Sequence, residues 1–200
     1  MEPEEFIEKA VILLTVVAAV MYVHYNLSEL AAEKVIDLTE NASMGFRVSD
    51  DIRKAQVYFE GDDGTLECKL SAGETVWRCS DEDWNYVGSS PQKLGGKLRK
   101  CTWAHPVTNK TLIIRFEDEN LNSALKGYYG IIDGISVDKP GIVTLAVLVD
   151  GVKVFDGFTY TPGLKSIDIG PTQGSRIEFR VFTDRGLRRH FCFDVWSESA

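Results

Sequence analysis

The chain contains three histidines, the side chains best suited to act as a general base for a serine, cysteine or aspartate nucleophile. They are His24 in the N-terminal apolar segment, His105 before a proline and His190 after two arginines. None of them lies in a motif that places a base beside a nucleophile. The sequence therefore predicts no catalytic residue and no enzyme, and we expect His105 and His190 to be surface or loop residues.

Acidic residues and cysteines could instead hold a metal ion, but their spacing does not favour it. The acidic group at residues 60–63 lacks the ligand spacing and the closing glutamate of an EF-hand. The four cysteines form no CxxC pair, which excludes a zinc knuckle. Loops at residues 118–122 and 133–138 are candidates for a structural calcium, although nothing in their spacing requires one. We expect no metal at a functional site and no cofactor.

Aromatic residues offer binding chemistry, because sugars stack their apolar CH faces on Trp and Tyr while polar neighbours bind the hydroxyls. Trp84 and Tyr86 lie in the turn-like stretch 81–90 and are expected to be exposed. With Asp83 and Asn85 they form the predicted ligand-binding loop.

An alternative interpretation assigns the aromatic residues to structure, since large aromatic side chains dominate the interiors of proteins. Trp77 and Trp103 would then be core residues beside the disulfides, Trp84 would only cover the fold, and Trp196 would also be structural. Both interpretations of Trp84 remain open at this point.

The charge of the chain limits its partners. The formal net charge is -8 and the basic residues are scattered along the sequence. Because such a surface repels a phosphate backbone and lacks a basic patch, we expect no nucleic-acid partner.

Residues 10–28 form an apolar run without a formal charge, AVILLTVVAAVMYVHYNLS. At 1.5 Å per residue, a helix of this length spans about 28 Å, close to the hydrocarbon thickness of a bilayer. The run therefore predicts an N-terminal transmembrane helix over residues 1–28, with residues 10–28 in contact with the membrane.

The flanks of the run favour an uncleaved anchor over two alternatives. A signal peptide would begin with a basic region, whereas four glutamates among the first eight residues face only Lys9 here. A buried core helix would show a polar face, whereas residues 11–23 are apolar on all sides except at Thr15.

The orientation of the span follows from the rest of the chain, because Lys9 and Lys34 nearly cancel in the positive-inside rule. All four cysteines lie in the β-rich part, as an oxidising compartment permits. Asn-x-Ser/Thr sequons occur at Asn26, Asn41 and Asn109, of which Asn26 is too close to the membrane for modification. We expect a single-pass protein of the cell membrane whose β domain is extracytoplasmic, with Asn41 and Asn109 as glycosylation sites.

Residues 29–44 are expected to continue the helix as an amphipathic stalk. Apolar residues recur here at intervals of three and four, with acidic residues and Lys34 on the other faces. This narrow apolar stripe could contact a partner helix or its own β domain.

Beyond residue 45, short runs rich in Val, Ile, Phe and Thr alternate with Gly, Asp and Pro, which predicts a mainly β sandwich or barrel over residues 45–200. Strands are expected at residues 55–60, 66–70, 74–78, 98–104, 111–117, 127–132, 142–149, 152–158, 166–169, 176–183 and 190–196.

Asp150-Gly151 lies between two apolar runs and predicts a two-residue hairpin, because a type I′ turn needs positive φ at both central residues. Residues 142–149 are apolar on both faces, as expected for a central strand that is covered on each side. Residues 176–183 alternate between apolar and charged residues, so one face of that strand should be solvated.

Residues 97–199 carry four segments in a recognisable order: GYYGIIDGIS, GIVTLAVLVDGVKVFDG, SIDIGPTQGSRIEFRVFTDRG and FCFDVW. This order resembles the novel putative carbohydrate-binding module (NPCBM) group of galactose-binding-like jelly rolls. The resemblance implies a jelly-roll sandwich and a carbohydrate ligand. Residues 66–80 and 100–110 depart from the pattern of the group, as expected for a more specialised subfamily.

The resemblance also implies a disulfide connectivity. In such jelly rolls the first and last strands of the module lie near each other, which would bring Cys101 to Cys192. Cys68 and Cys79 would then close a small loop.

These observations lead to three functional hypotheses. The first is a membrane-anchored, non-catalytic module that binds a glycan or a glycoprotein. The second is an accessory subunit of a larger membrane complex, for example one handling glycans or exported proteins, with contacts through the transmembrane helix and stalk. The third is a pilin-like filament subunit, against which the acidic leader argues.

Overall fold

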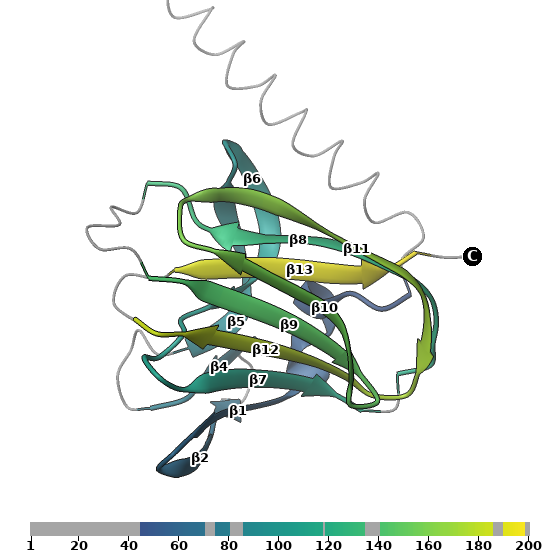
Figure 1. The fold of residues 1–200 in the computed structure, drawn as a ribbon, viewed down its shortest axis with the longest axis horizontal. Helices are drawn as coiled ribbons and strands as arrows, with labels where there is room; N and C mark the ends of the chain where they lie inside the picture. Colours follow the sequence, from purple (N-terminus) through teal and green to yellow (C-terminus); the bar gives the residue numbers. More distant parts are fainter. Residues whose placement is uncertain are drawn as a thin grey trace, which may run out of the picture. The chain divides into compact units, whose positions relative to one another are not determined.

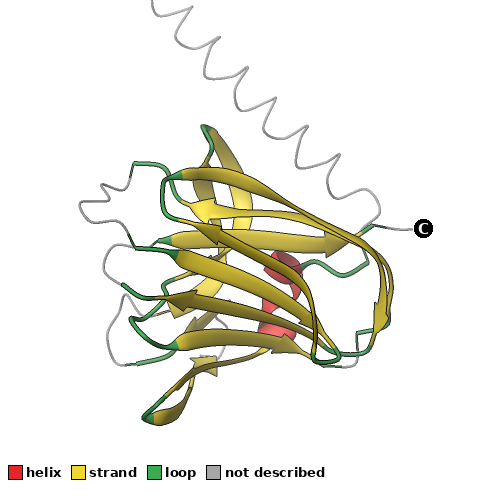
Figure 2. Cartoon of the chain, viewed as in Figure 1, coloured by secondary structure: helices red, strands yellow, loops and turns green. Residues whose placement is uncertain are grey.

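Runs of β-branched and aromatic residues, separated by Gly, Asp and Pro, form the strands of two sheets (Figures 1 and 2). The computed structural model describes residues 45–70, 75–80, 86–117, 119–134, 141–185 and 190–198. A helical turn, α2 (Val48–Asp51), and the 3-10 helix η1 (Ile52–Lys54) precede the first strand.

The first sheet has six strands in the order β10-β9-β12-β7-β1-β2. Their bounds are β1 Gln56–Gly61, β2 Gly64–Glu67, β7 Thr111–Phe116, β9 Val143–Val149, β10 Val152–Thr159 and β12 Ile177–Thr183. The second sheet has seven strands in the order β11-β8-β13-β6-β5-β4-β3. Their bounds are β3 Lys69–Leu70, β4 Val76–Arg78, β5 Tyr86–Leu94, β6 Lys97–Ala104, β8 Leu121–Ile131, β11 Gly163–Gly174 and β13 Phe191–Ser197.

Strands β6 to β13 cross between the sheets in jelly-roll order, with only the β9–β10 hairpin remaining within one sheet. In one sheet β6, β13, β8 and β11 lie side by side, and in the other β7, β12, β9 and β10 do so. This is the arrangement of an eight-stranded jelly roll, so the predicted mainly β jelly-roll sandwich is confirmed. The predicted transmembrane helix and stalk lie outside the described residues, among which no helix has the length and apolar character needed to cross a bilayer.

Alternate residues of the two sheets point into a shared apolar core. In β9, Val143, Leu145 and Val147 are fully buried. The rings of Phe179 and Phe193, from opposite sheets, lie 5.4 Å apart and close the space between the layers. Burial of each such side chain stabilises the fold by about 1.5–3 kcal/mol.

The turn between β9 and β10 has the predicted geometry, with φ of 47° at Asp150 and 84° at Gly151. The carboxylate of Asp150 accepts hydrogen bonds from the backbone N–H groups of Arg176 and Ser175, at 2.9 and 3.2 Å. Through these hydrogen bonds the hairpin also fixes the backbone of the segment that joins β11 to β12.

The hairpin of β5 and β6 crosses the outer face of its own sheet. β6 pairs with β13 only over residues 102–104, and its earlier part leaves that strand. Near the tip of the hairpin, Leu94 lies against Gly130 of β8 and Gly95 lies against Leu164 of β11. The hydroxyl of Tyr128 donates a hydrogen bond to the carbonyl of Lys100. The hairpin therefore covers β8 and β13 from outside.

A small second core lies beneath this hairpin. Leu94, Cys101, Tyr128 and Cys192 are buried in it, and a disulfide joins Cys101 of β6 to Cys192 of β13. The structure also contains the disulfide between Cys68 and Cys79. Both expected pairs are thus present.

The segment ahead of β1 fills the gap that opens between β6 and β13. Arg47 forms a β-bridge with Trp196, and α2 contacts both strands. The guanidinium Nε of Arg47 donates to the carboxylate of Asp194 at 2.6 Å, and Ser49 donates both its N–H and its hydroxyl to that carboxylate at 3.0 Å. All three residues are buried, so the start of the domain is held by a buried ionic network.

Two predictions about strands are wrong. Residues 86–90 were expected in a turn-like stretch, but they begin β5, which is paired with both β4 and β6. The strand at residues 142–149 was expected to be covered on both faces, but Thr144, Ala146 and Leu148 are only half-buried. Ala146 lies between Asp156 and Arg180 on the neighbouring strands. This face of β9 therefore carries a small apolar residue flanked by charged side chains.

Candidate functional site

Tyr86 and Trp103 meet on the outer face of the seven-stranded sheet. Gly88 lies opposite Trp103 in the ladder of β5 and β6, so strand alternation places Tyr86, Gly88 and Trp103 on the same face. The two rings are 4.1 Å apart at an angle of 40°. Trp103 is only 5% exposed, whereas Tyr86 is half-buried. Tyr86 is therefore the outer ring of the pair, supported by Trp103 from within.

His105 and His190 extend this arrangement, because Ala104 and Phe191 pair at the adjacent ends of β6 and β13. The ring of His190 lies 5.4 Å from Trp103 and that of His105 lies 5.9 Å from it. The two imidazoles are 5.0 Å apart. Tyr86, Trp103, His105 and His190 are called the aromatic cluster below.

Both imidazoles of the cluster favour the neutral form. Burial, and then the neighbouring His190, lower the pKa of His105 to about 4. Burial also lowers the pKa of His190. At neutral pH the cluster therefore offers uncharged rings, which suit contact with an uncharged ligand.

A hollow of about 330 Å³ lies beside the cluster. Val76 and Trp103 flank Gly88 on either side across β4, β5 and β6. A Cβ at Gly88 would lie 2.9 Å from the carbonyl oxygen of Thr75, so the close approach of β4 requires glycine. The hollow is lined by Val76, Arg78, Tyr86, Gly88, Ser89 and Ser90.

The lining of the hollow combines one ring with polar groups. Tyr86 presents an aromatic surface and a hydroxyl, Arg78 a guanidinium, and Ser90 a hydroxyl. The side-chain amide of Gln92 donates to Ser90 Oγ at 3.0 Å and orients that hydroxyl. An apolar surface beside donors and acceptors is the arrangement that suits a pyranose ring with its hydroxyl groups.

Trp103 adds an unusual feature to the cluster. Its indole Nε1 is buried and forms no hydrogen bond with any of the described residues. Most buried donors form a hydrogen bond, so this N–H is an exception; because it is shielded from solvent, it is not among the groups that line the hollow.

The structure includes only one of the four predicted ligand-binding residues. Tyr86 lies in the hollow, whereas Asp83, Trp84 and Asn85 fall outside the described residues and remain predictions. In the sequence they directly precede β5.

The other predicted residues have separate places. Trp77 packs against the core and its indole N–H donates to the carbonyl of Ile52 at 2.9 Å, so it is structural as the alternative interpretation held. Asn109 is exposed with φ of 58°, while Asn41 lies outside the described residues. Glycosylation of both stays a prediction. No group of His, Cys, Asp and Glu suited to a metal ion occurs in the described part of the chain.

Sequence reasoning missed the histidines of this cluster. His105 was expected at the surface or in a loop; it does follow β6 directly, but only 7% of it is exposed. The two histidines are far apart in the sequence and meet only because β6 pairs with β13. In the sequence, the only indication was that His105 and His190 lie close to Cys101 and Cys192, the cysteines of the predicted disulfide.

The buried imidazole of His105 predicts a loss of stability in acid. Its folded-state pKa of about 4 lies below the unfolded value of about 6.5, so the unfolded chain binds the extra proton between these values. The stabilisation is thus complete above pH 6.5 and is lost as the pH falls towards 4, by about 3 kcal/mol at most. Urea unfolding from pH 7 to 4.5 should show a smaller decline for His105→Gln than for the wild type; equal declines would contradict the assignment.

Comparisons with known proteins give structural similarities only. No family model matches the sequence, and no curated protein matches it. Tandem CBM51 modules of a family 98 glycoside hydrolase from Streptococcus pneumoniae are 13% identical, with 65% of this chain and 45% of that chain covered and a TM-score of 0.48. The CBM51-2 and INT domains of ZmpB from Clostridium perfringens, in complex with GlcNAc, are 15% identical, with 78% and 40% covered and a TM-score of 0.45.

A third similar structure is the CBM51 module of Clostridium perfringens GH95 in complex with methyl-galactose. It is 16% identical, with 66% of this chain and 92% of that chain covered and a TM-score of 0.41. The chain spans less than half the length of the first two structures. With TM-scores below 0.5, these similarities carry no conclusion about a ligand, and the site described above depends on its own geometry.

Proposed function

We propose that this chain is a non-catalytic module that binds a glycan, either free or on a glycoprotein, in the hollow beside Tyr86. The observation that carries the proposal is the pairing of Tyr86 with Trp103 next to Arg78 and Ser90. A sugar placed there has its CH face on Tyr86 and its hydroxyls within reach of the guanidinium and the serine. The neutral imidazoles behind the ring add no charge to this surface at neutral pH.

The binding test uses the full chain purified in mild detergent. We expect binding to a subset of neutral glycans on an array, followed by calorimetry with the strongest of them. Tyr86→Ala should weaken the affinity roughly tenfold, because a single aromatic contact contributes about 1–1.5 kcal/mol. Trp84→Ala tests the predicted neighbouring residue in the same assay.

Two further variants separate binding from folding. Tyr160→Ala removes an exposed tyrosine outside the hollow and should leave the affinity unchanged. Arg78→Gln replaces an exposed side chain of the hollow and should weaken binding without loss of stability. No binding on the array, or an affinity that Tyr86→Ala leaves unchanged, would reject the proposal.

We also propose that residues 10–28 anchor the chain in the cell membrane, with the β domain on the extracytoplasmic side. The charge-free apolar run and the two disulfides support this orientation. Protease added outside intact cells should remove the β domain. Protection of the domain until the membrane is opened would contradict the orientation, and release by salt alone would contradict the anchor.

A further inference from the structure

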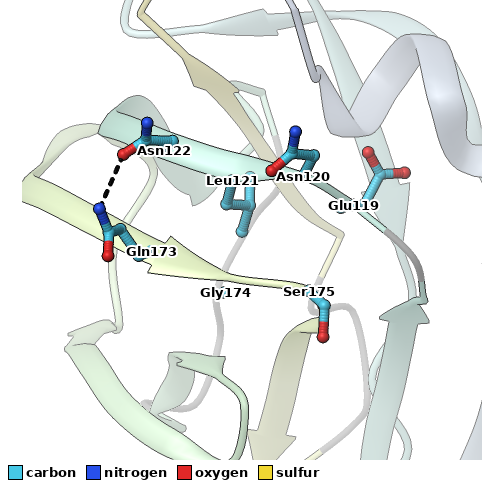
Figure 3. A pocket seen from close by; sticks show the side chains of 7 residues that line it. All are labelled: Glu119, Asn120, Leu121, Asn122, Gln173, Gly174 and Ser175. Carbon is cyan, nitrogen blue, oxygen red and sulfur yellow. Dashed lines mark hydrogen bonds between the residues drawn. The ribbon is translucent and has the colours of Figure 1, made fainter.

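A second concavity lies where β8 begins and β11 ends. It has a volume of about 560 Å³ and is open to solvent. Figure 3 shows the side chains that line it. It is lined by Glu119, Asn120, Leu121, Asn122, Gln173, Gly174 and Ser175. We call it the amide groove, because three of these side chains are carboxamides.

The walls of the amide groove are tied together by the backbone. Leu121 pairs with Gly174 and Asn122 pairs with Gln173 in the ladder of β8 and β11. The N–H of Glu119 donates to the carbonyl of Ser175 at 2.8 Å. The groove is therefore largely pre-formed, which lowers the entropic cost of binding.

The turn at Asp150 also fixes the β11 side of the amide groove. Its carboxylate accepts from Ser175 and Arg176, and the N–H of Asp150 donates to the carbonyl of Arg176 at 2.9 Å. A Cβ at Gly174 would lie 2.3 Å from a methyl group of Val149, so only glycine allows this approach.

The side chains of the groove select for hydroxyl groups. Asn120, Asn122 and Gln173 each offer a donor and an acceptor, and the amide of Gln173 donates to Asn122 Oδ1 at 3.0 Å (Figure 3). No Lys, Arg or aromatic residue is among the lining residues, so neither an anion nor an aromatic stacking partner is favoured. Leu121 is buried and forms no apolar surface for a lipid or a hydrophobic peptide.

Glu119 adds one acidic group to this neutral surface. Burial, and then Asp51, raise the pKa of its carboxyl group, although Lys54 acts in the opposite direction. A carboxylate that is partly desolvated in this way gains from a ligand that donates hydrogen bonds, as vicinal hydroxyls do.

We propose that the amide groove is a second carbohydrate-binding site, which takes the hydroxyl groups of a neutral sugar without aromatic stacking. The proposal shares the ligand class of the proposed function but none of its residues. Leu121 and Ile131 stand at opposite ends of β8, and Ile131 flanks Phe191 at the end of the sheet that carries the aromatic cluster. Ten residues of strand span about 33 Å, so one monosaccharide cannot reach both sites.

Two such sites would raise the avidity for a glycan surface or a long polysaccharide, because the second contact becomes intramolecular after the first. Each site by itself would bind weakly, which is consistent with the open form of the groove.

The test follows the side-chain amide signals of asparagine and glutamine by NMR in the full chain in detergent. The probes are methyl galactoside, N-acetylglucosamine and chitohexaose, with sodium sulfate and calcium chloride as separate titrations. We expect the amides of Asn120 and Gln173 to shift with at least one sugar, in the wild type and in Tyr86→Ala alike. Asn120→Ala and Gln173→Ala should each weaken that response roughly three- to tenfold, as loss of one hydrogen bond does.

The outcomes distinguish the two sites. A sugar response at Tyr86 with none at Asn120 and Gln173 would overturn this inference and leave the proposed function intact. If the amides of Asn120 and Gln173 respond to a sugar and Tyr86→Ala binds that sugar with the affinity of the wild type, the result would support the groove and reject the hollow. A response to sulfate or calcium but to no sugar would overturn the inference. Asn120 and Gln173 are exposed, so their replacement should leave the fold unchanged.

Discussion

Replacing Arg47 with alanine is expected to lower the free energy of unfolding by about 3–5 kcal/mol, the cost of leaving one charge of a buried pair without its partner. Arg47 is 2% exposed and Asp194 is fully buried, and 2.6 Å separate the donor nitrogen from the carboxylate oxygen. Urea denaturation of the wild type and the variant measures the difference. A change below 1 kcal/mol would show that the segment ahead of β1 is held by its apolar contacts instead.

The pH dependence of this effect follows from Asp194. Burial raises the pKa of its carboxyl group to about 6, although Arg47 and Ser49 act in the opposite direction. Removal of Arg47 raises that pKa further, so the folded variant takes up a proton that the unfolded chain binds only in stronger acid. The destabilisation by Arg47→Ala should therefore be largest above the raised pKa of Asp194 in the variant, shrink as the pH falls from there towards 6, and stay constant below 6, where both folded proteins bind the proton.

A double variant provides the control. Arg47→Met with Asp194→Leu removes both charges and keeps most of the buried volume, so it should be less destabilised than Arg47→Ala. An equal or larger loss in the double variant would assign the effect to packing against Trp196, over which the guanidinium lies at 5.5 Å.

Removing the disulfide between Cys101 and Cys192 is expected to lower the free energy of unfolding by about 4–5 kcal/mol, because the bond closes a long loop in the unfolded chain. The two cysteines are 91 residues apart, against 11 for Cys68 and Cys79. The same model gives about 3 kcal/mol for the short loop. Paired cysteine-to-alanine variants of each bond, compared by urea unfolding, measure the two losses.

The long-loop disulfide also has a local effect. Both of its cysteines are buried in the small core with Leu94 and Tyr128, beneath the β5–β6 hairpin. Loss of the bond should increase hydrogen exchange in this hairpin before the rest of the sheet. Equal losses of stability for the two bonds would contradict the dependence on loop length. Unchanged hydrogen exchange in the hairpin would show that the bond does not stabilise the hairpin locally.

Strand positions, and the turn at Asp150, could be predicted from the sequence because they depend on neighbouring residues. The alternation of Ile177, Phe179 and Val181 with charged residues shows which side chains point inward, and Asp-Gly tolerates the positive φ of the turn. The jelly-roll order and the disulfide pairs came from the resemblance of residues 97–199 to a known group. The membrane span, the stalk and the residues around Trp84 stay predictions.

Strand β5 could not be predicted in the same way. Gly88, Ser89, Ser90 and Pro91 all have a low propensity for strands. They adopt the extended conformation because β6 pairs along the whole length of β5, and pairing with β4 ends at Gly88, so Pro91 lies where an absent N–H costs little.

The candidate sites depend on the tertiary structure even more. The sequence by itself predicted that Tyr86, an aromatic residue, binds a ligand, and it indicated which residues could face solvent. Only the pairing of β5, β6 and β13 decided that Trp103, His105 and His190 support it. The amide groove likewise needs the register of β8 with β11. Local patterns determine which face of a strand is apolar, whereas long-range packing of the two sheets decides which strands become neighbours.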